Sequence, residues 1–167
     1  FAVGTSLSLA HVLVTRGHAI EALARADHFV FDKTGTLPLG RLVLVDTLPL
    51  GILSPSAVLA IAAGLEQGSE HPIGRVLGAA AGAAPLAPVE DLRALTGQGI
   101  EARIAGELLR AGTPGFAGAL HDQPLPVDAV RWSETGGTVI ALANAAGWLA
   151  LFRFKDRLRS HAAAMLA

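Results

Sequence analysis

The six residues from Asp32 to Leu37 (Asp-Lys-Thr-Gly-Thr-Leu) constrain the possible fold more than any other stretch of the chain. They follow a short apolar run, residues 28–31, whose length suits a buried strand. The pattern places a carboxylate at the end of that strand, before a loop of small residues that exposes backbone N–H groups. Open α/β sheets bind ligands at this edge, and consecutive N–H groups form an anion cradle. A carboxylate in this position can attack a phosphoryl group and form an aspartyl phosphate.

The structural alternative is a strand followed by a hydrophilic turn, in which Asp32 and Gly35 serve only the backbone conformation. By spacing alone that interpretation is favoured. A chance match to the complete hexapeptide is rare, however, and the complete match favours the chemical interpretation.

Composition narrows the class of protein. Hydrophobic residues make up 51% of the 167 residues and charged residues 16%, which excludes disorder and favours one well-buried domain. A net charge of −1 gives no basic footprint for nucleic acid, and the lack of cysteine excludes disulfides and thiolate metal sites. The apolar stretch 1–14 is too short to span a membrane.

Periodicity predicts an α+β fold, with an antiparallel sheet flanked by helices. Ser54-Pro55 and His71-Pro72 each predict the start of a helix, and residues 5–26 have a helical pattern with a break at Gly17. Strands are predicted where apolar residues alternate or cluster, with a hairpin through 144–147. These strands cover residues 42–48, 100–104, 108–110, 138–143 and 148–154.

A second motif, Ser69-Glu70-His71-Pro72, follows the predicted helix that ends near Glu66. Pre-proline geometry places His71 just outside the next helix, whose positive end favours a neutral imidazole able to lie flat on an aromatic base. The alternative is a histidine that merely caps the helix.

Glycines mark a third element, Gly97-Gln98-Gly99-Ile100, and a fourth, Gly112-Thr113. Glycine lets a backbone approach phosphates closely, although a plain turn between strands explains an isolated Gly-x-Gly equally well.

In this order the motifs resemble those of heavy-metal (type IB) P-type ATPases. The resemblance implies that Asp32, within Asp32-Lys33-Thr34-Gly35-Thr36, takes the γ-phosphate of ATP. The Thr34 carbonyl and Asp32 would help to hold Mg²⁺, and Thr36 would contact phosphate. Soluble haloacid-dehalogenase-like phosphatases resemble Asp-x-Asp here, and Thr34 cannot supply their second, acid–base carboxylate.

The same resemblance implies a nucleotide site. His71 would pack on adenine and Glu66 would hydrogen-bond its edge. Gly97, Gly99 and Ile100 would lie along the triphosphate, and Gly112 with Thr113 would contact the nucleotide. The chain departs from the family pattern at three positions. Pro38 stands where threonine is usual, Thr113 where asparagine is usual, and Gly137 where lysine is usual.

The resemblance also implies a domain order: a stalk or linker helix (1–26), one piece of the phosphorylation domain (27–39), a nucleotide-binding domain (40–153) and the start of the second phosphorylation half (154–167). Asp156 and Arg159 resemble the Asp-x-x-Arg element of that half, and their spacing suits a helix surface. The Thr-Gly-Asp and Gly-Asp-Gly-x-Asn-Asp elements that complete catalysis are missing from the sequence, so the chain is expected to bind ATP without sustained turnover.

The chain is thus expected to be a cytoplasmic domain of an integral membrane protein that moves a heavy-metal cation through other segments. The stretch 13–36 is most similar to copper exporters, which favours copper. Two alternatives stay open: a soluble haloacid-dehalogenase-like phosphatase, and a non-catalytic nucleotide-binding regulator.

Overall fold

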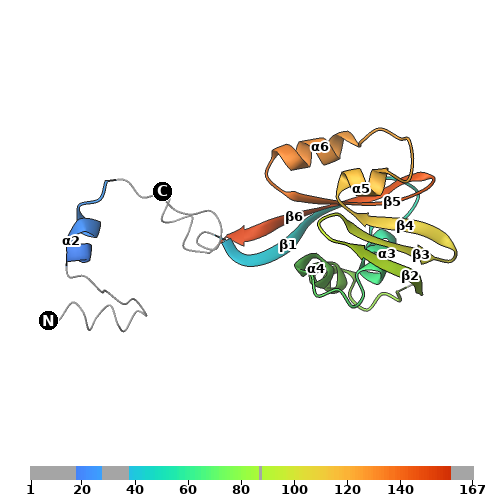
Figure 1. Ribbon diagram of the computed structural model, residues 1–167, viewed down its shortest axis with the longest axis horizontal. Coiled ribbons are helices and arrows are strands. Elements are labelled where there is room, and N and C mark those ends of the chain that lie inside the picture. The colour runs from blue at the N-terminus through green and yellow to red at the C-terminus, as the bar shows by residue number, and fades with distance from the viewer. Residues whose placement is uncertain (1–17, 28–37, 87, 159–167) are drawn as a thin grey trace. The chain divides into compact units, whose positions relative to one another are not determined.

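The computed structural model describes residues 18–27, 38–86 and 88–158. The chain divides into two units, 1–37 and 38–167. In the first unit the helix α2, His18–Ala24, lies within the stretch predicted to be helical (Figure 1). None of the described helices is long and apolar enough to cross a membrane.

The second unit is built on a six-stranded antiparallel sheet, as the sequence predicts (Figure 1). The strands lie in the order β1-β6-β5-β4-β3-β2, so the two strands furthest apart in sequence, β1 and β6, pair with each other. Their bounds are Pro38–Pro49 for β1, Val89–Leu95 for β2, Gly99–Ile104 for β3, Glu107–Gly112 for β4, Thr138–Asn144 for β5 and Gly147–Leu158 for β6.

Helices cover both faces of this sheet (Figure 1). One face carries α3 (Pro55–Leu65) and α4 (Pro72–Ala81), which begin where the sequence predicts. The side chain of Ser54 caps α3 by accepting a hydrogen bond of 3.2 Å from the N–H of Ala57. The opposite face carries two shorter helices, α5 (Pro114–Gly118) and α6 (Val127–Glu134).

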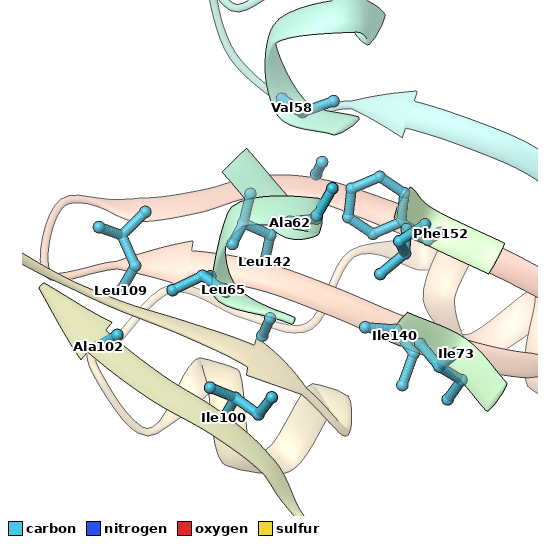
Figure 2. Packing of buried hydrophobic residues seen from close by; sticks show 14 of the residues in the cluster. Val58, Ala62, Leu65, Ile73, Ile100, Ala102, Leu109, Ile140, Leu142 and Phe152 are labelled. Carbon is cyan, nitrogen blue, oxygen red and sulfur yellow. The ribbon is translucent and has the colours of Figure 1, made fainter. Parts of the chain in front are cut away.

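Alternation along β5 and β6 divides the core into two layers. Ile140, Leu142 and Phe152 face α3 and α4, and Figure 2 shows them gathered with Val58 and Leu65 of α3. The intervening side chains, among them Val139, Ala141 and Leu151, pack instead with Ala129 and Trp132 of α6. Because both faces are covered, six of the seven residues of the middle strand β5 are buried.

The structure confirms the hairpin, since Asn144 and Gly147 pair as the last residues of β5 and the first of β6. Strand β2 and helices α5 and α6 were not predicted. The expectation that Asp156 lies on a helix is wrong: Asp156 belongs to β6 and pairs with Leu42 of β1. The antiparallel ladder continues past Phe154, where the sequence pattern predicted the strand to end. Arg159 is outside the described residues.

Candidate functional site

A cavity of about 520 Å³ opens between the α3–α4 connection, the turn from β2 to β3, and the ends of β4 and β5. It collects every residue that the sequence predicted to bind a nucleotide. These residues come from three separate parts of the chain, and the fold brings them to one place: Glu66, His71, Gly97, Gly99, Ile100, Gly112 and Thr113.

Glu66 lies at the carboxyl end of α3, where its backbone N–H still bonds to Ala62. Its Oε2 atom is buried and has no hydrogen-bond partner among the described residues. Gly74 of α4 makes room for this carboxylate, because a Cβ at Gly74 would lie 2.8 Å from Oε2. Nothing local in the sequence singles out Gly74, because its importance depends on its contact with Glu66 at the end of another helix.

His71 lines the cavity and also caps α4. Its Nδ1 accepts a hydrogen bond of 3.2 Å from the N–H of Ile73, so a neutral ring carries its proton on Nε2. Ser69 supports the turn by accepting a hydrogen bond from the N–H of His71. The two interpretations of His71, capping residue and cavity residue, are therefore compatible.

The glycines that line the cavity are also required by the backbone of the sheet. Gly99 and Gly112 are opposite each other in the β3–β4 register, and a Cβ would lie 2.2 Å from the Ala111 oxygen at Gly99 and 2.2 Å from the Gln98 oxygen at Gly112. Gly97 has a φ of +73°, which suits glycine in the turn before β3. The close approach of these two strands requires glycine whether or not a phosphate lies nearby.

Thr113 is an N-cap residue, because its Oγ1 accepts a hydrogen bond of 3.3 Å from the N–H of Phe116 in α5. Its hydroxyl hydrogen remains available to a ligand. Thr113-Pro114 repeats the Ser54-Pro55 pattern and could have predicted α5 from the sequence.

The remaining wall of the cavity is largely apolar. Ile73, Ile140 and the predicted Ile100 contribute to it, as does Thr138 at the start of β5. A second cavity of about 320 Å³ shares His71, Ile73 and Thr138 with the first and adds Asp156. Ile73, Ile140 and Asp156 were not predicted as site residues, because nothing local in the sequence separates a wall residue from a core residue.

The predicted catalytic residues Asp32, Lys33, Thr34 and Thr36 lie outside the described residues. Within the described ranges there is no group of three or more His, Cys, Asp or Glu side chains that could hold a metal ion.

Comparison with known proteins gives consistent relatives, although no family model matches the chain. A probable copper-transporting ATPase of Synechococcus sp. is 38% identical over 154 residues, which is 91% of this chain and 19% of the relative. A crystal structure of a zinc-transporting PIB-type ATPase superimposes with a TM-score of 0.73 at 33% identity, covering 91% of this chain and 25% of that one. The N-domain of HMA6, a copper-transporting P-type ATPase, shares the fold over its full length and 70% of this chain, with a TM-score of 0.59 at 20% identity.

The chain spans about a fifth of the length of the curated relatives it matches. The similarity extends over nine-tenths of the chain, and the six-stranded antiparallel sheet with its flanking helices matches the solved domains. The chain belongs to the heavy-metal P-type ATPases, and its described part has the fold of their nucleotide-binding domain.

Proposed function

We propose that the larger cavity binds the adenine base of ATP, with Glu66 accepting a hydrogen bond from the exocyclic amine and His71 packing on the ring. The observation that carries this proposal is the buried Oε2 of Glu66, which has no hydrogen-bond partner in the described part of the chain and lies at a largely apolar cavity. A buried acceptor without a donor costs free energy, which an N–H group of a ligand would offset. Apolar walls with few polar groups are typical of sites for flat organic ligands.

In the whole protein, ATP held in this way phosphorylates Asp32. A carboxylate oxygen of Asp32 attacks the γ-phosphorus, the bond to the bridging oxygen breaks, and ADP leaves. Water then hydrolyses the aspartyl phosphate and regenerates the carboxylate. Asp32 and the Thr34 carbonyl are oxygen ligands of the kind Mg²⁺ prefers, and the ion would offset phosphoryl charge. Lys33 and Thr36 belong to the same loop and would border the phosphoryl group. Family membership supports these roles.

The phosphorylation cycle would drive transport of a heavy-metal cation through membrane segments of the parent protein, with this chain on the cytoplasmic side. Copper is favoured by the sequence of residues 13–36 and by the copper-transporting relative. The proposed domain order is a stalk helix (1–26), two pieces of the phosphorylation domain (27–39 and 154–167) and the nucleotide-binding domain between them (40–153).

Base selectivity tests the role of Glu66. In a calorimetric titration of the 167-residue chain, ATP should bind at least about tenfold more tightly than GTP. The guanine ring would place its carbonyl oxygen against the Glu66 carboxylate, and two acceptors cannot form a hydrogen bond with each other. Glu66→Gln should reduce this preference, since an amide can present an N–H to guanine. Glu70→Gln is the matched control, because Glu70 lines neither cavity. Equal binding of ATP and GTP by the native chain would overturn the assignment of Glu66.

A further inference from the structure

The turn between α6 and β5 connects the second face of the sheet to the candidate site. It consists of Thr135, Gly136 and Gly137, and the next residue, Thr138, lines both cavities. Gly136 has a φ of +76°, a conformation that glycine adopts readily. Two successive glycines give a turn much conformational freedom, so the position of this turn depends on the side chains that contact it.

Arg153 of β6 holds this turn from the second face of the sheet. Its Nη2 donates a hydrogen bond of 2.8 Å to Oγ1 of Thr135, and that hydroxyl donates in turn to the carbonyl of Arg131 at 3.0 Å. The guanidinium also lies over the ring of Trp132, 5.9 Å from its centroid, and donates to Oδ2 of Asp46 at 3.4 Å. The Arg153 side chain is 15% exposed, so contacts with α6, with the turn and with β1 fix a largely buried cation.

Gly137 makes room for Arg153. The φ of Gly137 is outside the left-handed region, so its backbone conformation does not require glycine. A Cβ at Gly137 would lie 3.1 Å from Nε and 3.2 Å from Cγ of Arg153, and 3.1 Å from the carbonyl oxygen of Phe154. A larger residue at this position would therefore displace the Arg153 side chain, and the two positions depend on each other.

We infer that Arg153 is a positioning residue for ATP binding, which it supports through the turn and Thr138. The inference rests on the proposed function, because Arg153 itself lines neither cavity. Thr138 directly follows Gly137 and shares both cavities with His71 and Ile73. A shift of the turn would therefore move the Thr138 hydroxyl, which can donate or accept a hydrogen bond, relative to these residues.

The first test is a calorimetric titration of ATP into Arg153→Ala, in the 167-residue chain and below its unfolding transition. Affinity should fall by about fivefold, because the turn loses the side chain that holds it. Leu151→Ala is the control, since it removes a buried side chain from the same strand and the same face without touching the turn, and it should bind ATP as the native chain does. An equal loss in both variants would overturn the inference, because Arg153 would then only stabilise the fold.

A second substitution distinguishes positioning from lost packing. Gly137→Lys alone should also weaken ATP binding by about fivefold, because the lysine displaces Arg153. In the Arg153→Ala background the same lysine enters the vacated space and again offers a cation to the turn, so affinity should return to within about twofold of the native value. A double variant that binds ATP as weakly as either single variant would contradict the inference.

Thr138→Ala tests the route of the effect. Alone it should weaken ATP binding by about fivefold, and adding Arg153→Ala should then change affinity by less than about twofold, because the group that Arg153 positions is already gone. Native affinity in Thr138→Ala, or a further full loss in the double variant, would overturn the inference while the proposed function stands. If the native chain does not bind ATP, the proposed function fails and the inference fails with it.

Discussion

The two faces of the sheet have cores of different composition. The face under α3 and α4 is packed with large side chains, including Leu65, Leu77 and Phe152, and it borders the cavity. The face under α5 and α6 is packed mainly with small residues and with Trp132.

The two faces also differ in the loops that connect their helices. On the second face, hydrogen bonds join the loop between α5 and α6 to the β5–β6 hairpin: Trp148 donates to the carbonyl of Pro124 at 2.9 Å, and Gln123 donates to that of Ala146 at 2.9 Å. On the first face, the connection between α3 and α4 leaves Oε2 of Glu66 unpaired at the cavity. Buried atoms of His121 and Arg153 are also unpaired in the described part, but they line neither cavity. The proposed ligand site therefore lies on the first face of the sheet.

The largest expected effect comes from substitutions at two adjacent residues of β6 whose side chains lie on opposite faces of the sheet. Phe152→Ala, on the α3/α4 face, should lower the free energy of unfolding by about 3–5 kcal/mol and weaken ATP binding, because the cavity wall loses its support. Leu151→Ala, on the other face, should cost about 2–5 kcal/mol and leave ATP affinity unchanged. Denaturant unfolding and calorimetry below the unfolding transition measure both. Equal loss of affinity in the two variants would remove the distinction between the faces.

A smaller effect is expected where the strands approach most closely. Gly112→Ala should lower the free energy of unfolding by about 1–3 kcal/mol, because its Cβ would meet the Gln98 carbonyl at 2.2 Å. Gly115→Ala is the matched control, since a Cβ at Gly115 meets nothing within 4 Å and alanine favours the helix. Denaturant unfolding of the two variants provides the comparison. A Gly112→Ala chain as stable as the control would show that this close approach is not required.

Substitutions of two glycines in α4 test the position of the Glu66 carboxylate. Gly74→Ala should weaken ATP binding by about tenfold, or about 1.4 kcal/mol, because its Cβ displaces Oε2 of Glu66. Gly78→Ala lies on the same helix with nothing within 4 Å, and it should stabilise the fold by about 0.5–1 kcal/mol without changing affinity. Calorimetric titration with ATP checks the pair. Unchanged ATP binding in Gly74→Ala would mean that the position of Oε2 is unimportant.

The smallest effect concerns the fixed loop on the second face. Trp148→Phe removes the hydrogen bond to Pro124 and should lower the free energy of unfolding by about 0.5–1.5 kcal/mol. ATP affinity should stay the same, because Trp148 lines neither cavity. A loss of affinity would show that the two faces are coupled.

Much of the fold could be predicted because it depends on local signals. Ser54-Pro55 and His71-Pro72 predicted the starts of α3 and α4, and alternation predicted β3 and the β5–β6 hairpin. Strand β2 lacks such a signal, because it lies at the edge of the sheet and most of its residues are exposed. Helices α5 and α6 are short and present too few turns to show periodicity, although Thr113-Pro114 marks the start of α5.

The candidate site also contains residues that local sequence signals predict and residues that they do not. Residues within short motifs, such as His71 and Gly99, could be predicted because their chemistry or backbone requirement is local. Gly74 and Asp156 could not, because the contact of Gly74 with Glu66 and the position of Asp156 at the smaller cavity depend on how separate elements pack. The strand that contains Asp156 is extended by pairing with β1, a partner more than a hundred residues earlier in the chain.

The measurement that tests the central claim most directly is ATP titration of His71→Ala and His71→Asn beside the native chain. Asparagine retains a side-chain oxygen able to cap α4, but it lacks the ring that would pack on adenine. We predict that both variants lose at least about tenfold in ATP affinity, while His71→Asn keeps the native free energy of unfolding within about 0.5 kcal/mol. Native ATP affinity in His71→Asn would contradict the account, because His71 would then serve only to cap the helix.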